Sequence, residues 1–118
     1  MTPIPSGYRI TRHGLRPDWY TEAEDPPDLH HVFLAKLYLA ENFDAARTRH
    51  YCSYALKGEV EREVGEYITN GALIQAAAEL DFILTPRQTN ARIFIKACDS
   101  RRRRLREEDL TGRWSLVR

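Results

Sequence analysis

Residues 69–81 constrain the fold of this 118-residue chain more than any other stretch. Thr69 can cap a helix with its side-chain oxygen. The apolar side chains that follow repeat with a helical period, and they are Leu73, Ile74, Ala76, Ala77, Ala78 and Leu80. A helix that is apolar over most of its circumference is normally buried against several neighbours. We therefore expect a buried central helix around which the rest of the chain is organised.

The N-terminal part, residues 1–27, is expected to be an arm. Residues 8–12 alternate apolar and polar side chains, which favours a short strand. Pro26 and Pro27 mark its end, and residues 28–118 should form a single globular domain. A first helix should begin there, with Asp25 or Asp28 as its cap. Its predicted core stripe consists of Leu29, Val32, Phe33, Leu37 and Ala40.

A second helix is predicted to start at Asp44, which can cap it, and to end at Gly65, with Gly58 as a position where it can break or bend. After the central helix, residues 82–96 are rich in β-branched and aromatic side chains on either side of a polar loop, which predicts a β-hairpin. A last, basic helix is expected near residues 100–110. The predicted fold class is α+β but mainly α: a small bundle of about four helices with one hairpin.

Composition limits the kinds of protein this can be. With 42% hydrophobic and 30% charged residues, the chain resembles an ordinary globular domain, and it has no apolar run long enough to span a bilayer. The N-terminus lacks the basic and apolar regions of a signal peptide, so we expect a cytoplasmic protein. Cys52 and Cys98 are isolated from each other and from suitable ligands, which predicts no metal site, no disulfide and no cofactor.

Basic residues are concentrated towards the C-terminus. Residues 81–118 carry ten basic and five acidic side chains, whereas residues 41–80 carry four and seven. The basic run consists of Arg101, Arg102, Arg103, Arg104 and Arg106. In a simple helix these cations would lie at the unfavourable, positive end of the dipole. They should therefore pair with acidic side chains of residues 59–66, or bind an external polyanion or acidic protein surface.

A second group of candidate binding residues lies on the predicted second helix. There Arg47, Tyr51 and Tyr54 would share one face, with His50 beside them. Basic and aromatic side chains on a common face can contact phosphates and bases, or form a protein-binding hot spot. The alternative is a solvated flank whose tyrosines pack partly against the core.

The order helix, helix and hairpin also fits a winged helix-turn-helix, in which the second helix enters the DNA major groove. The central helix would be a poor recognition helix, since Gln75 and Glu79 are its main polar side chains. Arg87 and Arg92, at the predicted wing, could still hold phosphates without sequence preference. Nucleic-acid binding is therefore an alternative function.

Arg12, His13 and Gly14 follow the expected N-terminal strand. This tripeptide resembles the phosphate-binding signature of the histidine phosphatases, and the resemblance implies His13 as a phosphorylated nucleophile beside arginines that hold the phosphate. The match covers about six residues. That family needs a longer chain with alternating strands and helices and a second histidine, and this sequence offers no such alternation. We prefer a structural role for His13.

The function we favour from the sequence is that of a small, non-enzymatic protein that occupies the surface of a macromolecular partner, either a protein or a protein–nucleic acid complex. The sequence predicts a full core and offers no convincing active site, and its tyrosines and arginines are residues that interfaces favour. In size and style it resembles phage and plasmid accessory inhibitors such as anti-CRISPR proteins. The apolar central helix leaves a homo-oligomer open as well.

Overall fold

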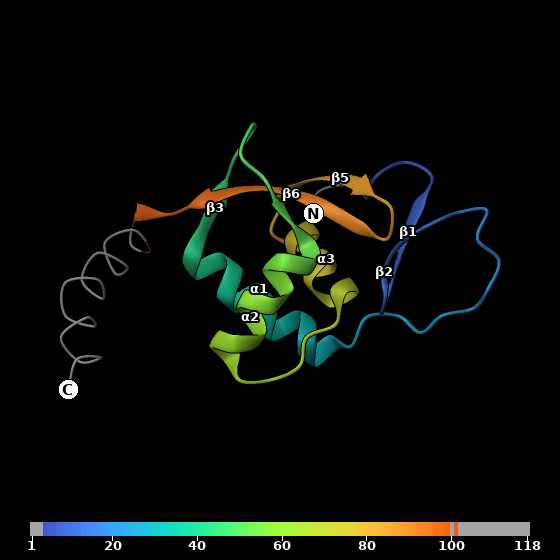
Figure 1. The fold of residues 1–118 in the computed structure, drawn as a ribbon, viewed down its shortest axis with the longest axis horizontal. Helices are drawn as coiled ribbons and strands as arrows, with labels where there is room; N and C mark the ends of the chain where they lie inside the picture. Colours follow the sequence, from blue (N-terminus) through green and yellow to red (C-terminus); the bar gives the residue numbers. More distant parts are fainter. Residues whose placement is uncertain (1–3, 100, 102–118) are drawn as a thin grey trace.

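A computed structural model of the protein describes residues 4–99 and residue 101 (Figure 1). In chain order the elements are β1 (Tyr8–Thr11), β2 (Gly14–Pro17), α1 (Leu29–Asn42), β3 (Phe43–Ala45), β4 (Tyr51–Cys52), α2 (Ser53–Val64), α3 (Asn70–Glu79), β5 (Ile83–Arg87) and β6 (Asn90–Ala97). The described part thus contains three helices and six strands, arranged in two antiparallel sheets. The prediction of a mainly helical four-helix bundle was wrong, because residues expected in an arm and in a helix form strands.

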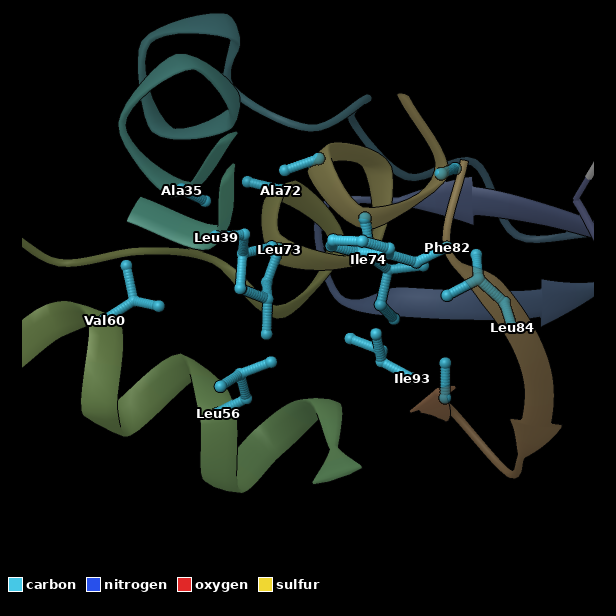
Figure 2. Packing of buried hydrophobic residues seen from close by; sticks show 14 of the residues in the cluster. Ala35, Leu39, Leu56, Val60, Ala72, Leu73, Ile74, Phe82, Leu84 and Ile93 are labelled. Carbon is cyan, nitrogen blue, oxygen red and sulfur yellow. The ribbon is translucent and has the colours of Figure 1, made fainter. Parts of the chain in front are cut away.

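The central helix was predicted correctly. Thr69 caps α3 by accepting a hydrogen bond from the backbone N–H of Ala72 at 3.2 Å. From Asn70 to Ala78 every residue of α3 except Gln75 is buried. The side chains of α3 fill the space between α1, α2 and the larger sheet, where Leu73 and Ile74 lie in one continuous core (Figure 2). This burial on several sides explains why the helix needs so few polar residues.

The larger sheet is built around β6. β5 pairs with β6 from Arg87↔Asn90 to Ile83↔Phe94, which confirms the predicted hairpin with a tighter turn than expected. β3 and β4 also pair antiparallel with β6, through Ala45↔Ile95 and Tyr51↔Ile93. All three helices lie on the same side of this sheet, and residues 46–50 project away from them (Figure 1).

The second predicted helix was wrong over its first nine residues. Asp44 does not cap a helix but lies in β3, opposite Lys96, and α2 begins only at Ser53. The reason is non-local, since residues 43–45 and 51–52 pair with the edge of β6 that β5 leaves open. The end of α2 was predicted correctly, with Gly65 in the left-handed conformation at φ 74°.

The N-terminal strand was also predicted correctly, and it pairs with β2 in a small separate hairpin. This hairpin packs closely on the start of α3. The backbone N–H of Gly71 donates to the carbonyl of Arg12 at 3.1 Å. A Cβ at position 71 would collide with the carbonyl oxygen of Thr11, so only glycine fits where α3 and β1 meet.

Candidate functional site

The outer face of the larger sheet, turned away from the helices, is the first candidate site. Along β6, the side chains of Ala91, Ile93 and Ile95 are buried against the core. Because side chains alternate along a strand, those of Arg92, Phe94 and Lys96 lie on the opposite face. In the register of the sheet, Ile83 lies opposite Phe94.

This surface carries a strong excess of positive charge. The strands β3 to β6 and residues 46–50 contain five cationic side chains apart from His50, and these are Arg47, Arg49, Arg87, Arg92 and Lys96. Asp44 is the single carboxylate in the same segments. We call the outer face of β3 to β6, together with the projecting residues 46–50, the basic sheet face. Within the described part of the chain, none of its five cations forms an ion pair with a carboxylate.

Most of the other cations in the described part of the chain have a carboxylate partner, and the exceptions are Arg9 and Arg62. Lys36 pairs with Glu79 at 3.3 Å, Lys57 with Glu61, and Arg16 with Glu24 at 2.6 Å. Such pairs cancel much of the field that a polyanion would feel. The basic sheet face therefore concentrates uncompensated positive charge on one side of the fold.

An apolar and aromatic centre lies within this basic surface. The ring of Phe94 is half-buried, and the exposed ring of His50 lies against it with 5.1 Å between ring centroids and a 54° tilt. Ile83, beside Phe94 across the hairpin, leaves 47% of its surface exposed. The backbone N–H of Ala46 donates to the carbonyl of Phe94 at 3.0 Å and so anchors the projecting segment beside the ring.

The structure divides the predicted group of Arg47, His50, Tyr51 and Tyr54. The prediction that these residues share one face of a helix was wrong. Arg47 and His50 lie in residues 46–50, Tyr51 lies in β4, and Tyr54 lies in the first turn of α2. Arg47 and His50 join the basic sheet face. Tyr51 packs edge-on against the core residue Phe43, with centroids 5.4 Å apart. Tyr54 is exposed on α2, near Lys57.

The two arginines predicted as phosphate contacts, Arg87 and Arg92, both lie on the basic sheet face, near the turn of the β5–β6 hairpin. Sequence reasoning missed Arg49, Ile83, Phe94 and Lys96 as members of this surface. The signal was available for three of these residues, since Ile83, Phe94 and Lys96 sit at the alternate positions of the two predicted strands.

Arg101 is held inside the domain. Its guanidinium donates two hydrogen bonds to the carboxylate of Glu59, at 2.9 and 3.0 Å, and one to the hydroxyl of Tyr38 at 3.3 Å. The guanidinium also stacks over the ring of Phe43, 4.6 Å from its centroid. The sequence predicted that Arg101 would either pair with a carboxylate of residues 59–66 or bind an external partner. The structure shows the first of these contacts, with Glu59. Arg102, Arg103, Arg104, Arg106 and the predicted helix at 100–110 lie outside the described residues, apart from Arg101 itself.

These contacts shift the pKa values of the group. Burial of the Tyr38 hydroxyl and its hydrogen bond to Glu59, at 2.9 Å, raise the pKa of Tyr38 to about 12. Burial alone would raise the pKa of Glu59, but hydrogen bonds from Arg101 and Tyr38 outweigh it and the pKa is lowered. The hydrogen bond to Glu59 raises the pKa of Arg101. Each group is therefore stabilised in the protonation state that the cluster needs at neutral pH.

The second candidate surface is an apolar stripe on α1. Asp28 caps this helix as predicted, accepting from the backbone N–H groups of His30 and His31. Of the residues predicted to form the core stripe of α1, only Val32 is buried. The other buried residues of this helix are Ala35, Leu39 and Asn42. Three large side chains assigned to the core are exposed, and they are Leu29 at 84%, Phe33 at 58% and Leu37 at 55%. Their i, i+4 and i+8 spacing places them in one row, which we call the α1 stripe.

The α1 stripe borders a groove between α1 and α2 with a volume of about 560 Å³. Leu34, Leu37 and Val64 supply apolar lining, and Glu41 and Glu63 supply carboxylates. A row of exposed apolar side chains beside a groove with a polar rim is typical of a protein-binding surface. This arrangement differs in character from the basic sheet face.

Arg12 and His13 lie in the turn between β1 and β2. The Nε2 atom of His13 is 3.5 Å from a carboxylate oxygen of Glu24, whose pKa is lowered chiefly by its hydrogen bond from Arg16. The carbonyl of His13 accepts a hydrogen bond from the side-chain amide of Asn70 at 3.0 Å. These contacts tie the turn to α3 and support the structural role preferred for His13.

Comparison with known proteins adds no further assignment. No known protein family, curated protein or solved structure matches this chain. Among the described residues, no group of three or more His, Cys, Asp or Glu side chains could hold a metal ion. No helix within the described ranges is long and apolar enough to cross a membrane. The basic sheet face and the α1 stripe are therefore the features from which a function can be proposed.

Proposed function

We propose that the protein binds nucleic acid without catalysing a reaction, and that the basic sheet face is its binding surface. The observation that carries this proposal is the set of five cations on the basic sheet face, which no described helix covers, and none of the five pairs with a carboxylate in the described part of the chain. Lysine and arginine side chains that neutralise phosphates supply most of the affinity of non-specific nucleic-acid binding. Side chains already paired with carboxylates would contribute less.

The surface differs from that of a winged helix-turn-helix. In such a fold the second helix, here α3, would enter the major groove. α3 is buried along almost its whole length and is covered by α1, α2 and the hairpins, so it can present no row of side chains to base edges. A nucleic acid would instead lie across the sheet, with Arg87 and Arg92 among its phosphate contacts.

The test is a fluorescence anisotropy titration of labelled oligonucleotides of about 16 nucleotides at low salt. Replacing Arg47, Arg87 and Arg92 together with glutamine should lower affinity by about tenfold or more. A control replaces Arg62 and Lys36, two cations on the helical side, with glutamine and should change affinity far less per charge removed. Equal losses in the two variants, or no binding by the wild-type protein, would refute the proposal.

The C-terminal arginines need a separate variant, because they too are strongly basic. Replacing Arg102, Arg103 and Arg104 with glutamine measures their contribution in the same titration. This variant could lose all binding while the Arg47, Arg87 and Arg92 variant retains it. In that case the C-terminal arginines bind the nucleic acid, and the proposal that the basic sheet face binds it is wrong.

We propose as a second function that the α1 stripe binds an apolar surface on a protein partner, which agrees with the function favoured from the sequence. The supporting observation is the exposure of Leu29, Phe33 and Leu37 on a helix whose opposite face already contacts the core. Exposed apolar rows of this kind are unfavourable in water unless a partner covers them. Nucleic acid offers little apolar surface to such a row.

Co-purification from cells that naturally produce the protein, followed by reconstitution with the purified partner, tests this second function. Phe33→Lys should abolish the reconstituted complex. Trp19→Lys, which changes another strongly exposed apolar residue away from α1, should leave the complex intact. The remaining alternative is that the α1 stripe binds a second copy of this chain, and light scattering on the purified protein tests it. If the wild-type protein is a dimer that Phe33→Lys converts to a monomer, the partner is a second copy, and the proposal of a different protein is wrong.

A further inference from the structure

We infer that the ligand of the basic sheet face is a single-stranded nucleic acid whose bases stack on Phe94 and His50. This inference depends on the proposed nucleic-acid function and names the class of substrate. It starts from the arrangement of the surface, which has an aromatic and apolar centre with cations around it. A surface that only held phosphates would need the cations and not the centre.

The positions of the residues around Phe94 support stacking. Arg92 and Lys96 flank Phe94 on the same face of β6, each two residues away, which corresponds to about 6.6 Å along a strand. The exposed ring of His50 extends the aromatic surface from the projecting segment, and Arg47 and Arg49 lie in that same segment. A base placed on Phe94 would therefore have cations within reach of its phosphates on both sides.

Duplex nucleic acid could not use this centre. In a duplex the faces of the bases are already stacked on one another, and a flat protein surface meets mainly phosphates and sugars. In a single strand the bases can turn outward, and stacking on aromatic side chains contributes affinity with little sequence preference. Phe94, Ile83 and His50 thus favour single strands, whereas the five cations attract both forms.

The experiment compares single-stranded and duplex oligonucleotides of equal length at one salt concentration. Phe94→Leu keeps an apolar side chain of similar size in the strand, so it should leave the sheet intact and remove only the aromatic face. We expect single-strand affinity to fall by about fivefold or more and duplex affinity to stay the same. Trp19→Leu removes an exposed aromatic ring from a distant element and should change neither affinity.

His50→Ala provides an independent variant, because His50 is exposed and outside the strands and its loss should not impair folding. It should lower single-strand affinity in the same direction. Ultraviolet crosslinking to a single strand should then modify the tryptic peptide Ile93–Lys96, which contains Phe94. A crosslink confined to other peptides contradicts stacking at this position.

Failure of this inference and failure of the proposed function give different results. If the arginine variants lose binding but Phe94→Leu and His50→Ala do not, nucleic acid is bound by charge alone and the inference of stacking is wrong. If duplex affinity equals or exceeds single-strand affinity, the inferred substrate class is wrong. If neither form binds, the proposed function itself is wrong.

Discussion

Replacing Arg101 with methionine should destabilise the domain by about 2 kcal/mol, an estimate that follows from how deeply its ion pair is buried. Breaking a fully buried pair by removing one partner costs about 3–5 kcal/mol, whereas exposed pairs contribute about 0–1 kcal/mol. The side chains of Arg101 and Glu59 are 14% and 25% exposed, which lies between these cases. Methionine retains part of the packing over Phe43, so the loss should come mainly from the three hydrogen bonds.

Urea denaturation followed by circular dichroism measures this loss directly. Lys36→Met is the matched control, because Lys36 also pairs with a single glutamate but the two side chains are 42% and 31% exposed. The control should cost less than about 1 kcal/mol. If Arg101→Met costs no more than Lys36→Met, burial of the pair does not set its contribution and the reasoning is wrong.

Measuring the free energy of unfolding at several pH values tests the contribution of Arg101 in a second way. The pKa of Glu59 is lower in the folded protein than its ordinary value of 4.5, so its stabilising contribution is present above about pH 4.5 and is lost as pH falls through the folded pKa. The difference in stability between wild type and Arg101→Met should therefore shrink in acid. Tyr38 has the opposite pH dependence. Its pKa is raised from 10.0 to about 12, so its contribution to the stability of the fold is present below pH 10 and is lost towards pH 12. A wild-type protein whose advantage over the variant persists undiminished in acid would contradict the assignment to Glu59.

Three further predictions test the two surfaces and the core. Replacing Arg87 and Arg92 with glutamine should make the slope of log affinity against log salt shallower by about 1.4 for a single strand, as measured by anisotropy at several salt concentrations; an unchanged slope would exclude both as phosphate contacts. Leu39→Ala should cost about 2–5 kcal/mol in urea denaturation because Leu39 is fully buried, whereas Leu37→Ala should cost less than about 1 kcal/mol, and similar costs would refute the observed orientation of α1. Gly71→Ala should lower the melting temperature by separating α3 from β1, and a melting temperature equal to that of wild type would show that the contact can relax.

The parts of the fold that were predicted correctly depend on local signals. Thr69 caps α3, Asp28 caps α1 and Gly65 ends α2, each through contacts within a few residues of its own position. The β5–β6 hairpin is similarly local, since two strand-like segments meet at a short turn. Such features can be read from spacing alone because the partner of each group lies nearby in the sequence.

The errors concern choices made by distant partners. Asp44 is followed by two alanines, which is typical of a capped helix, yet residues 43–45 and 51–52 pair with β6, forty or more residues later. The helical period predicts that α1 is amphipathic, but apolar residues lie on more than one of its faces. Contact with α3 decides that Leu39 is buried and Leu37 is exposed, and periodicity carries no information about that contact.

The same distinction explains what could be predicted of the candidate site. Counting charge along the sequence placed the basic region at the C-terminus, in the run that begins at Arg101. In the folded domain Arg101 is neutralised by Glu59, while Arg47 and Arg92, nearly half the domain apart in sequence, share a face through the pairing of β4 with β6. Net charge counted along the sequence therefore does not show where unpaired cations gather on the described surface, because ion pairing neutralises some cations and strand register brings others together. Arg92 and Lys96 flank Phe94 on β6, and the apolar α1 stripe lies on a different element, so a nucleic-acid strand bound across the sheet as we propose would leave α1 free to contact a protein partner.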